Sequence, residues 1–154
     1  MRDPAIRIVQ LEPARVASAW AFGPSPERLA WQKLAAWAQS RGLLAEVVGR
    51  RIFGFNNPNP SQGSPNYGYE YWLTVEPSVM PEGDIRLVDF PGGLYAAMSF
   101  DLAGGDPGEV IPASWRRLDA WVAESQYQPA HHQWLEGHSM QGEPQELYYP
   151  VRAR

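Results

Sequence analysis

The chain repeats part of its own sequence, and this repeat limits the folds open to it. Residues Trp31, Leu34, Ala36 and Trp37 recur as Trp115, Leu118, Ala120 and Trp121, each pair 84 positions apart. Segment 16–22 is matched by 94–100, and segment 70–75 by 146–151. Three matches in the same order indicate a duplicated unit of strand, helix, strand and strand.

The duplication predicts the fold class. A half of about 75 residues buries too little apolar surface to be very stable alone, so we expect the two halves to share one core. We predict an α+β fold with pseudo-twofold symmetry, in which an antiparallel sheet and two main helices flank a ligand groove. The chain is then a single domain, 1–154, with halves at about 1–82 and 83–154.

Local patterns place the elements. Pro26–Ser40 has helical composition and apolar residues at three-to-four spacing, with Ser25 as N-cap and Gly42 at the C-terminal end. A second helix is predicted over 111–125. Strands are predicted at 6–11, 15–22, 44–48, 51–55, 69–75, 85–90, 94–100, 134–138 and 147–151. The Asn/Pro-rich stretch 56–68 is a loop, either a surface loop or a lid.

Composition excludes several classes of function. The chain has 154 residues and a net charge of −4, with 13 Lys and Arg and nowhere more than two adjacent, which argues against a nucleic-acid partner. It has no cysteine, so disulfides, thiolate catalysis and cysteine zinc sites are ruled out. It has no apolar run of membrane-spanning length. We expect a cytoplasmic protein without a helix-turn-helix segment.

Several motifs, in order, resemble those of GyrI-like domains. They are 16–24, the Ala30–Trp37 run, Phe53-Gly54-Phe55 with the Asn/Pro loop, 69–75, 90–96, Leu135-Glu136 and 146–151. The resemblance covers roughly residues 5 to 151. It implies two strand–helix–strand–strand units, a fold used as the effector-sensing domain of multidrug-responsive regulators and in stand-alone proteins. Some members of the family resemble hydrolases that open the cyclopropane ring of DNA-alkylating toxins.

The resemblance also implies a site. The family's central glutamate falls on Glu136, and its late-strand tyrosine on Tyr148. Two positions after the glutamate, where the family often has tyrosine, this chain has His138. The position related by symmetry to Glu136 lies near Gly54, which would leave room for a ligand.

Glu136 supports three interpretations. Among aromatic rings its carboxylate would bind a cation while the rings stack on the ligand. In a hydrolase it would act as the catalytic base that activates water. On the third interpretation, it is a surface residue at a strand end. We interpret Glu70 and Glu146 as paired structural carboxylates or edge-strand carboxylates, and not as catalytic groups.

Aromatic residues complete the candidate site. The predicted ligand-binding residues are Trp20, Phe55, Tyr71, Trp72, Trp115, Glu136, His138 and Tyr148, while Trp37 and Trp121 fall on the apolar helix stripe and are expected in the core. Adjacent histidines seldom bind one ion, so we read His131 and His132 as solvated loop residues and predict no metal or cofactor.

Three functions remain at this point. The first is a stand-alone protein that binds hydrophobic, aromatic or cationic small molecules in drug or toxin resistance. The second is a hydrolase of cyclopropanoid toxins that uses Glu136. The third is an inhibitor of another protein, such as a topoisomerase. None of them needs a direct nucleic-acid or membrane contact.

Overall fold

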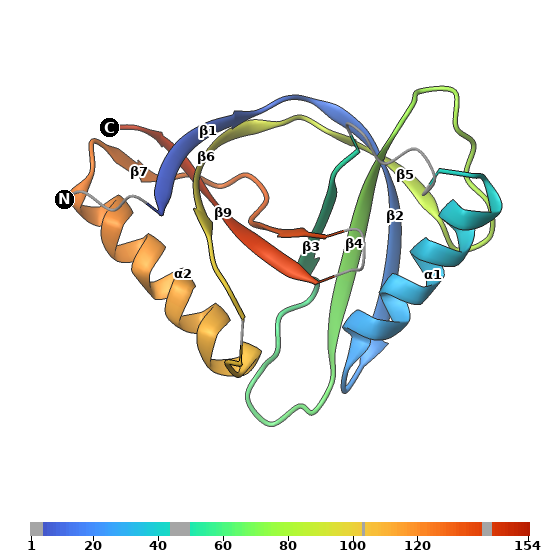
Figure 1. Ribbon diagram of the computed structural model, residues 1–154, viewed down its shortest axis with the longest axis horizontal. Coiled ribbons are helices and arrows are strands. Elements are labelled where there is room, and N and C mark those ends of the chain that lie inside the picture. The colour runs from blue at the N-terminus through green and yellow to red at the C-terminus, as the bar shows by residue number, and fades with distance from the viewer. Residues whose placement is uncertain (1–4, 44–49, 103, 140–142) are drawn as a thin grey trace. The chain divides into compact units, whose positions relative to one another are not determined.

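The computed structural model describes residues 5–43, 50–102, 104–139 and 143–154 (Figure 1). The chain divides into two compact units, each with one helix. The α1 unit consists of Pro13–Pro91 and His138–Glu143. The α2 unit consists of the residues up to Glu12, Gly92–Gly137 and Pro144–Arg154.

In the α1 unit, four antiparallel strands lie in the order β5-β2-β4-β3. Their bounds are β2 Ala14–Gly23, β3 Ile52–Asn56, β4 Tyr67–Val75 and β5 Arg86–Phe90. Helix α1, Pro26–Ser40, packs along β2 and β4 (Figure 1). Alternate residues of β2, such as Ala17 and Ala19, face the helix and leave room for Leu34 and Trp37.

The ends of α1 follow the predicted signals in part. Pro26 occupies the first turn, where its missing N–H costs nothing. Ser25 is the N-cap residue, but its side chain makes no capping hydrogen bond. Gly42, at φ +69°, ends the helix, and the Gly42 and Leu43 amides donate to the carbonyls of Gln39 and Ala38. This is the double hydrogen bond of a Schellman motif.

The α2 unit has the same plan. Strand β6, Gly93–Ser99, pairs with β1, Ile6–Leu11, and with β9, Pro144–Ala153. Short strand β7, Tyr127–Pro129, pairs with β9, and β8, Leu135–His138, lies beside β9 and ends at the first residue of the other unit. Helix α2, Pro107–Glu124, packs on β6 and β9 with Leu118 and Val122 fully buried.

Helix α2 begins earlier than predicted. It starts at Pro107 rather than at residue 111, because the Asp106 side chain accepts a hydrogen bond of 3.0 Å from the amide of Gly108. The segment before residue 111 is rich in glycine and proline, which is typical of a turn. An Asp-Pro pair is also a helix-start signal, and in this structure the helix begins at that pair.

The structure also shows a repeat that the sequence comparison missed. Ile6-Arg7-Ile8-Val9 corresponds to Ile85-Arg86-Leu87-Val88, so β1 and β5 are equivalent strands. β1 pairs with β6 from the second half of the sequence, and β5 pairs with β2 from the first. The two halves thus exchange their opening strands, and each compact unit contains residues from both.

The predicted alignment of β2 with β6 is wrong by one residue. It equated Ala19 with Ala97, yet Ala19 faces its helix and lies opposite Tyr71, whereas Ala97 lies opposite Tyr148 on the other face. Ser18, opposite Trp72, is the true equivalent of Ala97. A one-residue shift moves a side chain to the opposite face of a sheet, so this correction matters for the site.

The β3–β4 loop is tied at its base. The amide of Asn57 donates to the Gly68 carbonyl at 2.8 Å, and the amide of Gly68 donates to the Pro58 carbonyl at 3.0 Å. The indole N–H of Trp20 donates to the Asn57 carbonyl at 2.6 Å. The alternative that this loop acts as a lid stays a hypothesis, and the predicted strand 44–48 lies outside the described residues. In the described part of the chain, no helix is long and apolar enough to cross a membrane.

We expect Gly68→Ala to destabilise the protein strongly. A Cβ at this position would collide with the backbone carbonyl of Asn57, which cannot rotate away as a side chain would. The expected loss is about 3 kcal/mol in the free energy of unfolding, measured by urea denaturation. Gly108→Ala is the control, because its Cβ would meet only ordinary contacts in the first turn of α2. Equal stability of the two variants would contradict this account of the loop base.

Candidate functional site

The predicted ring residues of the α1 unit lie on both faces of its sheet. Tyr71 faces α1 as part of the helix-side core. Trp20, Phe55 and Trp72 lie on the opposite face, because along their strands they alternate with the residues that face the helix, and across strands they pair with Glu70 or Ser18. The prediction had gathered these four rings around Glu136.

A buried carboxylate lies between the rings on the face away from α1. Glu70 is 4% exposed. Its Oε2 accepts hydrogen bonds from the Ser18 hydroxyl at 2.6 Å and the Trp72 indole at 2.7 Å, and its Oε1 accepts from the Asn57 amide at 3.1 Å. Arg86 stands 3.7 Å from the same carboxylate. Such a set of donors offsets the desolvation of the buried charge, so Glu70 holds β2, β4 and the loop base together.

Rings surround this carboxylate. Trp72 contacts Phe55 edge-on at a centroid distance of 4.9 Å and Phe90 at 5.6 Å, and all three are buried. Trp20 stacks on Phe22 at 6.1 Å, and these two rings are exposed, at 43% and 50%. The three buried rings therefore belong to the packed interior, whereas Trp20 and Phe22 are accessible to a ligand.

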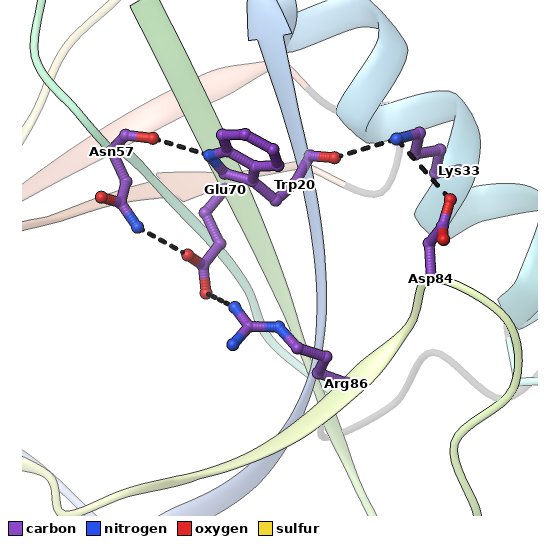
Figure 2. Close-up of a pocket in the computed structure, with 6 residues that line it drawn as sticks. All are labelled: Trp20, Lys33, Asn57, Glu70, Asp84 and Arg86. Atoms are coloured by element: carbon purple, nitrogen blue, oxygen red, sulfur yellow. Dashed lines mark hydrogen bonds and ion pairs between the residues drawn. The ribbon is translucent and has the colours of Figure 1, made fainter.

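A pocket opens beside the exposed pair. It has a volume of about 410 Å³ and is lined by Trp20, Lys33, Asn57, Glu70, Asp84 and Arg86 (Figure 2). Lys33, from α1, donates to the Trp20 carbonyl at 3.1 Å and lies 3.9 Å from Asp84. The lining thus combines an indole ring with two cations and two carboxylates.

The helix-side face of the α1 unit carries a second aromatic group. The His138 ring lies 4.7 Å from Tyr71, and its Nε2 is hydrogen-bonded to the Tyr69 hydroxyl at 2.8 Å. Trp31, from α1, lies 5.4 Å from Tyr71. A Cβ on Gly54 would collide with the Tyr69 hydroxyl and approach His138 Nε2 to 2.8 Å. The space over Gly54, which we predicted to be open for a ligand, is therefore filled by the side chains of Tyr69 and His138.

In the α2 unit, three rings gather on the helix side. Trp134 lies 4.3 Å from Tyr149 and 5.3 Å from Trp115, and it is 41% exposed. The Tyr149 hydroxyl donates to Asp119 Oδ1 at 2.7 Å. Burial and the Asp119 carboxylate together raise the pKa of Tyr149 to about 12.

Glu136 lies on the same side as this group. A Cβ on Gly137 would point at the Tyr148 ring, 3.0 Å away, so odd-numbered residues of β8 face Tyr148. Glu136 then faces the Tyr149 side, where Trp134 lies. Its side chain is half-buried. Trp115 and Glu136 are the two predicted residues that the structure places on one face of this unit.

Tyr148 lies on the opposite face. It contacts Tyr95 at 5.9 Å and donates to Glu146 Oε2 at 3.3 Å. Arg7 donates to the same oxygen at 2.7 Å. This arrangement matches Arg86, Glu70 and Trp72 of the α1 unit, so each unit carries an arginine, a glutamate and an aromatic donor at equivalent positions.

The two histidines outside β8 have different environments. His132 Nε2 is hydrogen-bonded to the Leu94 carbonyl at 2.8 Å, and its ring packs against Tyr95 at 4.8 Å. His132 is thus half-buried and held, contrary to the prediction of a solvated residue, whereas His131 is exposed. Over the described ranges no three His, Asp or Glu side chains gather as a metal site would require.

Sequence reasoning missed several contributors. In the ring groups they are Trp31, Tyr69, Trp134 and Tyr149, and in the pocket they include Lys33 and Arg86. Trp134 and Tyr149 carried a usable signal, because each stands two or one positions from a residue that had been chosen. Arg86 is marked by the Ile-Arg repeat with Ile6-Arg7.

The raised pKa of Tyr149 predicts a late titration step. In an ultraviolet titration, the difference between the wild-type protein and Tyr149→Phe should appear near pH 12 rather than at the ordinary 10.0. Because the fold favours the neutral phenol, this residue's contribution to stability falls as the pH rises from 10.0 to about 12. Asp119→Asn should bring the step to lower pH, since it removes the nearby charge. A step at the ordinary pH in the wild-type protein would contradict this environment.

Solved structures share this fold. The C-terminal domain of EcmrR matches with a TM-score of 0.69 and 14% identity, covering 97% of this chain and 98% of that domain. In the EcmrR–DNA complex the TM-score and identity are the same, and the chain spans 57% of EcmrR. A hydrolase from Listeria innocua matches with a TM-score of 0.69 and 12% identity, covering 99% of this chain and 94% of that one.

A more distant structure, that of SAV2435 bound to tetraphenylphosphonium, has a TM-score of 0.51 and 12% identity, covering 96% of this chain and 93% of that one. At these identities the likeness establishes the fold. It confirms the predicted α+β class with two helices and antiparallel strands.

The sequence itself identifies the family. No curated protein sequence matches the chain. The profile of Cass2, described as an integron-associated effector binding protein, matches residues 7–151. This match covers nearly all of the sequence and agrees with the predicted GyrI-like resemblance. The chain therefore belongs to the Cass2 family of integron-associated effector binding proteins.

Proposed function

We propose that this protein binds small lipophilic aromatic cations, with Glu136 as the counter-charge and Trp134 as the stacking surface. One observation carries the proposal. A half-buried carboxylate and a tryptophan that is 41% exposed share one face of the α2 unit. This pairing supplies both interactions that an aromatic cation needs, an opposite charge and a ring face.

The ring group suits such a ligand because it is already assembled. Trp134 is held between Trp115 and Tyr149, so little side-chain freedom remains to be lost on binding. The half-buried position of Glu136 strengthens its attraction for a cation relative to an exposed residue. In this proposal, binding serves drug or toxin resistance in the cytoplasm.

The family description and one solved structure of the same fold support this ligand class. The family is described as effector binding. SAV2435, which has the same fold, is bound to tetraphenylphosphonium, a cation that carries four phenyl rings. EcmrR contains a domain of this fold and has been solved as a complex with DNA.

We expect Glu136→Gln to weaken tetraphenylphosphonium binding about tenfold, because it removes the counter-charge but keeps the size of the side chain. Quenching of tryptophan fluorescence measures the affinity. Glu12→Gln is the matched control: it removes the same charge from an exposed position and should change the affinity little. Unchanged binding in Glu136→Gln would show that Glu136 is not the counter-charge.

A second candidate is a hydrolase that opens the cyclopropane ring of DNA-alkylating toxins. It is supported by the Listeria innocua structure of the same fold, which is described as a hydrolase. In this proposal Glu136 accepts a proton from water while the water oxygen bonds to a ring carbon. The ring bond breaks, and the released carbon takes up the proton, so that one water molecule is added.

The hydrolase candidate predicts a separation of binding from turnover. Glu136→Gln should abolish turnover of a cyclopropanoid substrate, because an amide cannot accept the proton. Binding of the uncharged substrate, followed by fluorescence quenching, should persist, since the variant keeps the shape of the site. Product formation is measured by chromatography. If the wild-type protein binds the substrate without forming product, the hydrolase candidate fails.

A further inference from the structure

The pocket beside Trp20 is distinct from the Glu136 face. All six of its lining residues belong to the α1 unit, whereas Glu136 and Trp134 belong to the α2 unit. Its volume of about 410 Å³ falls within the usual range for small-molecule sites. The proposal for Glu136 does not use it.

The walls of this pocket offer more hydrogen-bond donors than acceptors. Glu70 already accepts hydrogen bonds from Ser18, Trp72 and Asn57. Arg86 carries five N–H donors, and within the described ranges its one polar interaction is the 3.7 Å ion pair with Glu70, beyond hydrogen-bond length. Lys33 uses one N–H on the Trp20 carbonyl and stands 3.9 Å from Asp84. Available donors of this kind favour an acidic ligand group.

The equivalent arginines of the two units differ in their hydrogen bonding. Arg7, its counterpart, donates to Glu146 at 2.7 Å. In the α1 unit, Ser18 and Trp72 occupy the matching carboxylate oxygen instead. Arg86 is consequently kept near the pocket by charge while its donors stay available, and its side chain is 65% exposed.

The ring wall of the pocket is held in a fixed position. The Trp20 indole N–H is hydrogen-bonded to the Asn57 carbonyl (Figure 2), and the Trp20 ring stacks on Phe22. This leaves Trp20 43% exposed as a flat apolar surface beside the two cations. A planar ligand can stack there without ordering a mobile side chain.

We propose that this pocket binds a small planar aromatic carboxylate. The ligand carboxylate pairs with the guanidinium of Arg86 in the two-pronged geometry that arginine favours, with Lys33 as a second cation. The ring of the ligand lies on Trp20. Glu70 is a positioning residue: its charge keeps Arg86 near the pocket, and the ligand itself contacts the two cations.

Two probes with the same ring test the charge preference. Indole-3-acetate carries a carboxylate, and tryptamine carries an ammonium group on the same indole. Isothermal titration calorimetry on the full chain should show binding of indole-3-acetate at least tenfold tighter than that of tryptamine. Equal affinities, or tighter binding of tryptamine, would overturn the proposal.

Arginine variants locate the site. Arg86→Gln should weaken indole-3-acetate binding about tenfold or more, because it removes a charge-assisted hydrogen-bonded pair. Arg7→Gln is the matched control, since it changes the equivalent arginine of the other unit, and it should leave the affinity unchanged. An equal loss in both variants, or none in Arg86→Gln, would overturn the proposal. The thermal unfolding midpoint of each variant shows that it is folded.

A third variant separates this pocket from the Glu136 site. Glu136→Gln should leave indole-3-acetate binding unchanged even where it weakens tetraphenylphosphonium binding. Loss of indole-3-acetate binding in Glu136→Gln alone would place the ligand at Glu136 and overturn the pocket assignment. Failure of the tetraphenylphosphonium experiment would leave the result for Arg86 unaffected.

Discussion

Each central strand of this fold needs a hydrogen-bonded neighbour on both edges, and the chain meets this need by exchanging strands between its halves. β2 pairs with β4 and with β5, and β6 pairs with β9 and with β1. In both cases the outer neighbour comes from the other half of the sequence. Neither half alone could complete its sheet, because unpaired backbone groups on a central strand are costly. The exchange ties the two halves of the sequence together, because each compact unit contains strands from both.

The same alternation that builds the sheets gives each unit two chemically different faces. Small residues of the central strand, such as Ala19, face the helix and let it pack closely. On the other face, each unit carries a glutamate followed two residues later by an aromatic donor, Trp72 or Tyr148. The arginine of the exchanged strand completes the group. The repeat therefore preserves a charged cluster as well as a backbone plan.

The sequence predicted the architecture better than it predicted the site. Element types followed from periodicity and turn residues, and errors at element ends arose where two signals competed, as at Asp106 and Pro107. The site depended on which side of a strand each residue faces. The alignment of β2 with β6, wrong by one residue, equated residues on opposite faces. Trp20 and Trp72 were assigned to Glu136, although they lie next to Glu70 and Asn57 on the other face of the α1 unit.

Glu70 and Glu136 have similar sequence contexts, but we assign them different roles. Glu70 lies in a strand of aromatic residues, as Glu136 follows a tryptophan, and composition alone does not separate them. Hydrogen bonding does so for Glu70, because three neutral donors and a nearby arginine offset its burial and fix it in place. A carboxylate held this way stabilises the fold and directs its arginine outward. On our proposals, the α1 unit therefore presents a cation to ligands, whereas the α2 unit presents a carboxylate beside exposed Trp134.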